Sequence, residues 1–280
     1  MRFDGDAQVL LPSYLGWTPR EGSGVFDPIK ELGFRYSFYR VDSRLNIDLD
    51  HLEKLLSTKT VGIVILVHYF GRVDPNARVA AALARDAGAL VIEDSAHAML
   101  TDLVYGRAGD IGDVSLFSLH KLLAVPNGGL LMFNRIASPW LKKPEVSFED
   151  HVLPWHFDLQ TIAKRRVANA EFLGRLTATL VGEAEPLWTQ WATTCVPQTF
   201  PVLVKAGSRD LIHSQLNSRG FGAVSLYYQL VDEVLPEMFP EAHEVSSRIL
   251  NLPIHQDLDE ADITALVTEF QSCLAQGVAE

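Results

Sequence analysis

The chain is poor in cysteine and in positive charge. Two of its 280 residues are cysteine, Cys195 and Cys273, and neither belongs to a CxxC motif. We therefore expect no disulfide framework. We expect the protein to act in a reducing compartment, the cytoplasm. Lys and Arg number 24 against 35 Asp and Glu, which leaves a formal net charge of −11. Proteins that bind nucleic acid by neutralising its phosphates carry the opposite balance, so we expect no nucleic-acid partner.

The sequence also lacks a long apolar run and a metal-binding pattern. Its most apolar stretch, VGIVILVHYF at 61–70, has about half the length that a membrane span requires. The first residues, MRFDGDAQVLLPSY, contain no basic region followed by a long apolar segment, so a signal peptide is not expected. The nine histidines form no HExxH or related spacing. We therefore expect neither a membrane partner nor a bound metal.

Strand-like and helix-like segments alternate through the first half of the chain. Strands are expected at 8–14, 34–42, 61–70, 89–96, 113–120 and 128–134, and helices at 26–34, 46–57 and 74–88. Asp48 is the candidate N-cap of the helix at 46–57. Repeated β-α-β units with apolar strands are typical of an α/β protein whose mostly parallel sheet is covered by helices. We expect a large α/β domain over 1–150. Over 151–280 we expect a linking helix, predicted at 161–182, and a small α+β domain.

Polar side chains gather where three of the expected strands end. Strand by strand, they are His68 and Tyr69; Glu93, Asp94 and His97; and Ser118, His120 and Lys121. The carboxyl ends of strands in open α/β sheets form the ligand crevice. These side chains are therefore the candidates for a functional site.

Taken singly, each of these residues allows two interpretations. Asp94, in VIEDSAH, is either a surface carboxylate or a buried one, which needs a cation such as a protonated pyridine nitrogen. Lys121, in SLHKLLAVPNGG, is either a solvated lysine or a desolvated amine that can form a Schiff base. His97 is either a core histidine or a partner for a phenolic oxygen. Ser118 is either a strand-edge hydroxyl or a donor to a phosphate.

The order of the motifs along the chain is more informative than any one of them. The motifs are VLLPSY, FYRVD with IDLDHLEKLL, VHYFGRVDP, VIEDSAHA, GDVSLFSLHKLL with PNGG, and RILNLPIHQDLDEADI. In this order they resemble the DegT/DnrJ/EryC1/StrS aminotransferases over nearly the whole chain. These are pyridoxal-phosphate enzymes of fold type I, many of which act on nucleotide-linked keto sugars. The resemblance implies a large domain with a central, mostly parallel sheet and a smaller C-terminal domain.

The resemblance assigns roles to the residues at the strand ends. Lys121 matches the lysine that forms the Schiff base with pyridoxal 5'-phosphate, and Asp94 matches the carboxylate that pairs with the pyridine nitrogen. His97 matches a Gln or His that contacts the ring oxygen of the cofactor. Ser118 matches the serine that holds the phosphate, at a shorter spacing than the commonest family pattern. The family's ring-stacking aromatic follows the strand in VLLPSY, where the candidates are Tyr14 and Trp17.

Three parts of the family pattern are changed or not found. The family's helical arm and its Ser-Gly-Thr-type turn, whose helix N-terminus cradles the phosphate, would precede residue 1, because GDAQVLLPSY matches the strand that follows them. The asparagine that reaches the phosphate of the neighbouring subunit is not recognisable in HVLPWHFDLQTI. Asn127, in PNGG, stands where the family usually has glutamate.

The resemblance implies a PLP-dependent aminotransferase. It would take an amino group from a donor, commonly glutamate in the family, and pass it to a keto substrate such as a nucleotide-linked keto sugar. A homodimer is expected because family sites form between subunits, and the aromatic stretch 138–157 is a candidate contact or a loop packed on its own domain. Two alternatives stay open. One is a degenerate, non-catalytic member that acts as a binding or dimer partner, and the other is a chain whose start lies too far downstream.

Overall fold

The computed structural model describes residues 7–106, 108–135, 156–180, 182–191, 194–205 and 207–277. Six of its strands form one sheet in the order β2-β1-β3-β4-β5-β6. Their bounds are Gln8–Pro12 (β1), Arg35–Tyr39 (β2), Val61–Val67 (β3), Leu90–Asp94 (β4), Val114–Ser118 (β5) and Gly129–Phe133 (β6). The pairings from β2 through β5 are parallel and that of β5 with β6 is antiparallel. The expected α/β architecture with a mostly parallel sheet is therefore confirmed.

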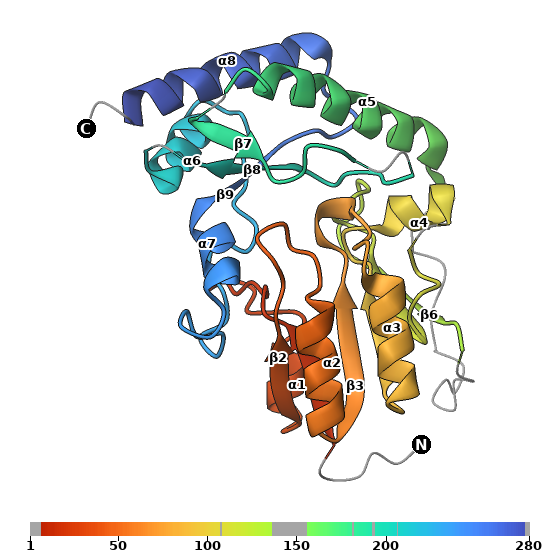
Figure 1. Ribbon diagram of the computed structural model, residues 1–280. Helices are drawn as coiled ribbons and strands as arrows, with labels where there is room; N and C mark the ends of the chain where they lie inside the picture. Colours follow the sequence, from red (N-terminus) through yellow and green to blue (C-terminus); the bar gives the residue numbers. More distant parts are fainter. Residues whose placement is uncertain are drawn as a thin grey trace.

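Helices between the strands pack against this sheet (Figure 1). They are α1 (Asp27–Glu31), α2 (Leu49–Thr58) and α3 (Ala77–Asp86), with the short 3-10 turn η1 (Tyr69–Gly71) after β3. Helix α4 (Met99–Tyr105) instead lies mainly against α5 (Leu159–Thr177) and η1. Asp48 caps the N-terminus of α2, and its side chain accepts a hydrogen bond from the backbone N–H of His51 at 2.9 Å. This is the N-cap that the sequence favours, because the carboxylate satisfies a donor that has no partner within the helix.

Most of the apolar run at 61–70 forms the central strand β3, which ends at Val67. Val64 and Leu66 on β3 are fully buried, and Ile65 and Val67 are each 5% exposed, so side chains on both faces of the strand are covered. Alternate side chains of a strand point to opposite faces, so a parallel strand with layers on both sides is apolar throughout. The apolar composition of this stretch is therefore explained by the layers that cover both faces of β3.

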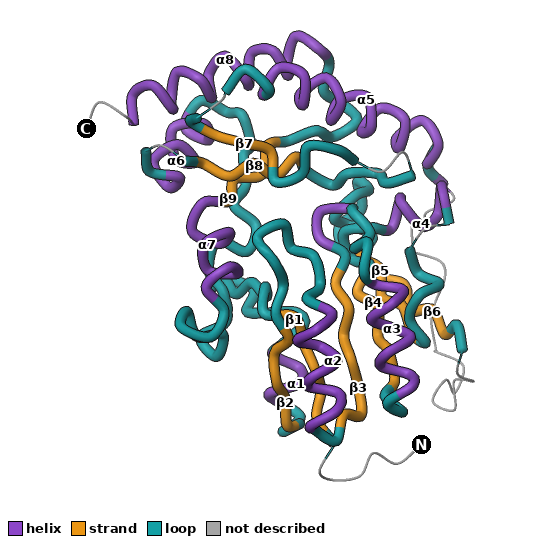
Figure 2. Tube along the Cα trace, in the orientation of Figure 1, coloured by secondary structure: helices purple, strands orange, loops and turns teal. Residues whose placement is uncertain are grey.

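A second, antiparallel sheet lies in the C-terminal half, in the order β7-β8-β9. Its strands are Ala184–Pro186, Phe200–Val204 and Ile249–Leu252. It packs with α5 (Leu159–Thr177), α6 (Arg209–Ser218) and α8 (Glu260–Gly277), and α5 runs beside α8 (Figures 1 and 2). Helix α7 (Pro240–Arg248) connects this unit to the first sheet. The sequence had indicated neither β7 nor α4 nor α7.

The two halves of the chain share one of their apolar clusters. Leu230, Val231, Val234 and Val245, from the segment before α7 and from α7 itself, belong to the same buried cluster as β1 and β3. Part of the expected C-terminal domain thus packs on the large sheet and reaches the ends of its strands. The division at residue 150 stays a prediction, since that residue lies outside the described part of the chain.

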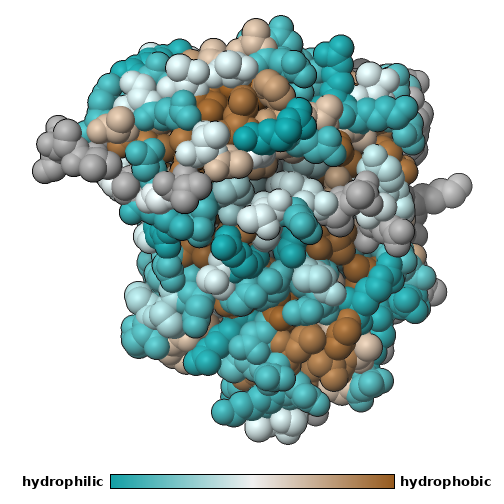
Figure 3. Space-filling view, turned by 45° about the horizontal axis from the view of Figure 1, so that its top comes forward, coloured by the Kyte–Doolittle hydropathy of each residue, from teal (hydrophilic) through white to brown (hydrophobic). Residues whose placement is uncertain are grey.

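The outer surface is that of an ordinary folded protein, with polar side chains and scattered apolar ones. The face shown in Figure 3 is mostly hydrophilic, with separate apolar patches. Exposed large apolar side chains such as Leu32, Leu131 and Met238 occur on different elements. Scattered exposure of this kind is normal for folded proteins. Among the described residues, no helix is both long and apolar enough to cross a membrane.

Candidate active site

The site lies where β4 and β5 end. These strands are parallel neighbours, with Asp94 paired to Leu116, so the turns that follow them leave the sheet side by side. His97 lies in the turn after β4 and Lys121 in the turn after β5. Nζ of Lys121 and Nε2 of His97 are 3.1 Å apart. The structure therefore brings together two of the residues that the sequence placed at different strand ends.

Asp94 closes β4 with a buried carboxylate. It is 8% exposed, and its Oδ1 accepts a hydrogen bond from the backbone N–H of Ala96 at 2.9 Å. Burial raises the pKa of Asp94, while the Ala96 N–H and the nearby Lys121 act in the opposite direction. A buried carboxylate with so little compensation is costly unless a cation binds it. A protonated ring nitrogen bound next to Asp94 would offset this cost of burial.

His97 is held in one tautomer by the backbone. Its Nδ1 accepts a hydrogen bond from the N–H of Phe70 at 3.2 Å, which leaves the ring proton on Nε2. Burial and the neighbouring Lys121 lower the pKa of His97 well below its usual range, so the ring is neutral. The Phe70 ring stacks on it, with centroids 5.9 Å apart and an interplanar angle of 24°. Nε2 is therefore a fixed hydrogen-bond donor aimed at Lys121.

The protonation state of Lys121 follows from the Nε2–H donor of His97. An Nε2–H group can hydrogen-bond an amine only if the amine offers a lone pair, so the 3.1 Å contact suits a neutral Lys121. Lys121 as a residue remains exposed, but partial burial lowers the pKa of its amine, and Asp94 and Glu21 offset this only in part. Desolvation of this kind is what turns a lysine into a nucleophile.

A buried network beneath the site fixes the end of β4. Nε2 of His68 donates to Oε1 of Glu93 at 2.8 Å, and Nδ1 of His68 accepts from the backbone N–H of Asp74. Glu93 also accepts hydrogen bonds from the loop before β5, namely from the N–H groups of Gly109, Ile111 and Gly112 and from Oγ of Ser115. This carboxylate therefore ties β3, β4 and the loop before β5 together next to Asp94.

Ser118 lies at the last position of β5 and is 9% exposed. Its Oγ is 3.3 Å from Nδ1 of His120. Its assignment to a phosphate stays a prediction.

The two aromatic candidates after β1 differ in their surroundings. Tyr14 is fully buried, and its ring meets that of Tyr69 edge-on at 5.3 Å. Trp17 is half-buried, and its backbone N–H donates to the carbonyl of Gln229 at 3.0 Å. The stacking role of both residues stays a prediction.

A third aromatic residue, Tyr227, was not found from the sequence. Its ring centroid lies 5.8 Å from that of His97 and 5.3 Å from that of Tyr14. Its sequence context, FGAVSLYYQLV, contains nothing that distinguishes this tyrosine from the next one. Tyr227 is identified only in the folded structure, in which its segment packs against the first sheet.

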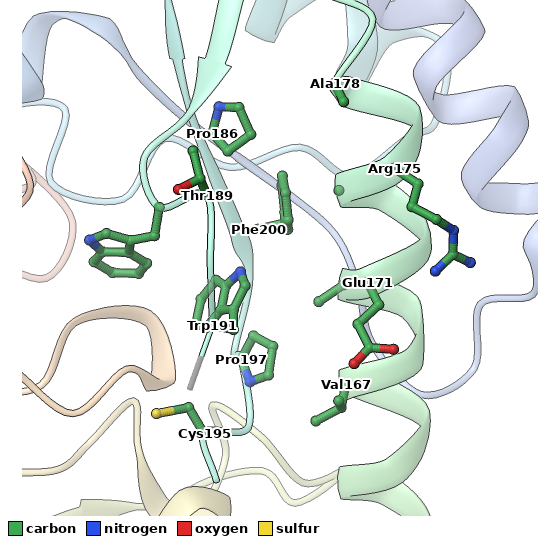
Figure 4. A pocket seen from close by; sticks show the side chains of 13 residues that line it. Val167, Glu171, Arg175, Ala178, Pro186, Thr189, Trp191, Cys195, Pro197 and Phe200 are labelled. Carbon is green, nitrogen blue, oxygen red and sulfur yellow. The ribbon is translucent and has the colours of Figure 1, made fainter. Parts of the chain in front are cut away.

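A separate cavity of about 580 Å³ lies between α5 and the segment 186–200 (Figure 4). Val167 on α5 and Ala178, directly after α5, face Pro186 and Phe200 across it, and the indole of Trp191 forms part of its wall. None of the residues at the strand ends lines this cavity. It is therefore not assigned to the reaction.

Among the described residues, no group of three or more His, Cys, Asp or Glu side chains could hold a metal ion.

Comparison with known proteins points to one family. The model of the DegT/DnrJ/EryC1/StrS aminotransferase family matches residues 23–143 and 157–271. A curated relative, the dTDP-4-dehydro-2,3,6-trideoxy-D-glucose 4-aminotransferase of Saccharopolyspora spinosa, is 24% identical over 90% of this chain and 76% of its own.

Solved structures agree with the family match. The aminotransferase TlmJ from Streptoalloteichus hindustanus has a TM-score of 0.73 at 25% identity, covering 97% of this chain and 80% of its own. A DegT DnrJ EryC1 StrS aminotransferase from Brucella abortus has a TM-score of 0.74 at 19% identity, with coverages of 95% and 79%. The family is therefore given by the sequence match, and the fold is that of these solved aminotransferases.

Proposed function

Because the chain belongs to the DegT/DnrJ/EryC1/StrS aminotransferase family, we propose that it transfers an amino group from glutamate to a nucleotide-linked keto sugar. Pyridoxal 5'-phosphate is the cofactor of this family. The observation that carries the proposal is the convergence of Asp94, His97 and Lys121 at the ends of β4 and β5. These are the residue types that the chemistry requires, and they come from two strands that lie side by side.

The residues present fit the ring end of the cofactor. When bound, pyridoxal phosphate supplies an aldehyde for the lysine and a ring that withdraws electrons from the reacting carbon. Asp94 offers a buried carboxylate to the ring nitrogen, and His97 offers an Nε2–H donor to the ring oxygen. Lys121 would hold the cofactor through Nζ, which lies 3.1 Å from Nε2 of His97, and Ser118 would offer its hydroxyl to the phosphate.

Each residue has a task that its surroundings support. Asp94 keeps the ring nitrogen protonated, because burial makes an unpaired carboxylate costly there. Lys121 would take up and return protons at Nζ, and the lowering of its pKa by burial favours the neutral amine that this role needs. His97 stays neutral and donates from a fixed position. Phe70 supports this geometry by its backbone N–H and its stacked ring.

The substrate class is supported by the names of related proteins. The Saccharopolyspora spinosa relative is an aminotransferase of a dTDP-linked keto sugar, and a structural neighbour, DesI, was solved in the presence of its TDP-sugar product. Glutamate as the amino donor, a homodimer and action in the cytoplasm belong to the same proposal. The expected contact segment 138–157 lies almost entirely outside the described residues.

The test is a titration of the purified protein with pyridoxal phosphate, followed by visible absorption. We expect a band from the lysine-bound cofactor in the wild type and in Lys54→Ala, which removes an exposed lysine on α2. The band should be lost in Lys121→Ala. A wild type without the band at saturating cofactor would contradict the proposal and favour a non-catalytic binding partner. Transfer is then measured as 2-oxoglutarate formed from glutamate in the presence of a dTDP-linked keto sugar.

A further inference from the structure

The segment between α6 and α7 is attached to the chain that follows β1. The N–H of Trp17 donates to the carbonyl of Gln229, and the N–H of Val231 donates to the carbonyl of Leu15, each at 3.0 Å. Gly16 and Leu230 form an antiparallel bridge between these two hydrogen bonds. A stretch of the C-terminal half is thereby fixed in register against the ends of the parallel strands.

Tyr227, on this segment, lies beside the residues of the candidate active site. Its ring centroid is 5.8 Å from His97, 6.0 Å from Phe70 and 5.3 Å from Tyr14. Burial raises the pKa of its phenol far above the usual range, and the charge of Asp94 adds to this effect. The ring is therefore neutral, and the carboxylate that would bind the pyridine nitrogen is close enough to influence it.

Gly16 makes room for this ring. A Cβ atom at position 16 would lie 2.4 Å from Cδ1 of Tyr227 and 3.0 Å from its Cγ, closer than real Cβ atoms come. The resemblance to the family predicts an aromatic residue in this part of the chain. Tyr14 is fully buried and turned edge-on to Tyr69. Because residue 16 is a glycine, the ring of Tyr227, from the other half of the chain, fits beside it.

The backbone of Tyr227 is held in an unusual conformation. Its φ is +60°, in the left-handed region that a tyrosine seldom adopts. Oγ of Ser246 on α7 donates to its carbonyl at 2.9 Å, which helps to fix it there. Strained backbone of this kind persists where the surroundings enforce it, and it concentrates at ligand sites.

From these observations we infer that Tyr227 is a cofactor-binding residue whose ring forms an aromatic wall of the pyridine site, in the space left by Gly16. The inference rests on the proposed function. An aromatic face attracts a protonated pyridine ring, so the wall and the Asp94 carboxylate favour the same charged form of the cofactor. The C-terminal half thereby supplies part of a site whose other residues come from the first sheet.

The first test compares variants at two adjacent tyrosines by titration with pyridoxal phosphate. The dissociation constant is read from the visible absorption and circular dichroism of the bound cofactor. Tyr227→Phe keeps the ring and should bind within about twofold of the wild type, whereas Tyr227→Ala should bind roughly tenfold more weakly. Tyr228→Ala is the matched control, since Tyr228 is 40% exposed, and it should bind as the wild type does.

The second test is a double-mutant cycle with Gly16→Ala. Its added methyl group should displace the Tyr227 ring and weaken cofactor binding in the wild-type background. In the Tyr227→Ala background no ring remains to be displaced, so the same change should have little further effect. Tyr227→Leu, which fills the space without an aromatic face, is measured alongside in case the alanine variant does not fold. Thermal melting of each protein without cofactor identifies variants that do not fold.

The outcomes separate this inference from the proposed function. If the wild type shows a Lys121-dependent band and both Tyr227→Ala and Tyr227→Leu bind the cofactor equally well, the role of Tyr227 is refuted and the aminotransferase proposal stands. If the wild type shows no such band, both are overturned. Loss of affinity in Tyr227→Leu, with affinity kept in Tyr227→Phe, supports the aromatic wall.

Discussion

Replacing Glu93 by glutamine tests how the strand that carries Asp94 is held in place. Glu93 is fully buried. One of its carboxylate oxygens accepts from Nε2 of His68 and the N–H of Gly109, and the other accepts from the N–H groups of Ile111 and Gly112. Glutamine replaces one of these oxygens with an NH₂ group. Whichever way the amide turns, its NH₂ group faces two N–H donors that then lose their acceptor.

The size of the effect follows from the pKa of Glu93. Burial alone would raise this pKa, but the interaction with His68 and the N–H groups of Gly112 and Gly109 outweigh it and lower the pKa from 4.5 to about 2. A shift of about 2.5 pKa units corresponds to about 3 kcal/mol of stability at neutral pH. Two donors left without an acceptor cost a comparable amount, about 1–3 kcal/mol each. We expect the free energy of unfolding of Glu93→Gln at pH 7 to be lower by about 3 kcal/mol.

The assay is urea unfolding of the cofactor-free protein, followed by circular dichroism between pH 7 and pH 4. The folded-state pKa is depressed, so the stabilisation is complete above the unfolded-state value of 4.5 and is lost as the pH falls toward 2. The difference between wild type and Glu93→Gln should therefore shrink by about 1 kcal/mol on going from pH 7 to pH 4. Glu53→Gln, at an exposed position on α2, is the control and should leave stability within about 0.5 kcal/mol of the wild type.

Two results would refute this reasoning. The first is a Glu93→Gln protein as stable at pH 7 as Glu53→Gln, since the network would then contribute nothing. The second is a difference that grows as the pH falls, which would mean that the folded-state pKa of Glu93 is raised rather than lowered.

Two further predictions concern single carboxylates. Asp94→Asn removes a buried charge whose pKa is raised by burial. The cofactor-free variant should melt at a higher temperature than the wild type at pH 7, with the gain vanishing below about pH 4, while its dissociation constant for pyridoxal phosphate rises at least about tenfold. A cofactor affinity equal to that of the wild type would refute pairing with the ring nitrogen. Asp48→Ala removes the cap of α2 and should lower the free energy of unfolding in urea by about 1 kcal/mol. Asp50→Ala, within the same first turn, is its control, and equal losses in both would exclude a capping effect.

Much of the fold was accessible from local pattern. The run at 61–70 predicts a strand because its residues 61–67 are apolar, and β3 occupies these positions. Asp48 predicted the start of α2 because a cap acts within one turn. Helix α7, at 240–248, was missed because its buried positions, such as Ala242 and Ser246, are small or polar and give weak periodicity. Its burial depends on partners from the first half of the chain.

The sequence by itself determined which side chains could carry the chemistry. Asp94, Ser118 and Lys121 stand at or just after the ends of apolar strands, and parallel strands bring such ends to one edge of a sheet. The tertiary structure decided the rest, because tautomers, protonation states and close approaches depend on groups that are distant in sequence. The N–H of Phe70 fixes the proton of His97, and that proton in turn suits a neutral Lys121. Tyr227 reaches the same site from more than two hundred residues beyond Gly16, through contacts that no local pattern contains.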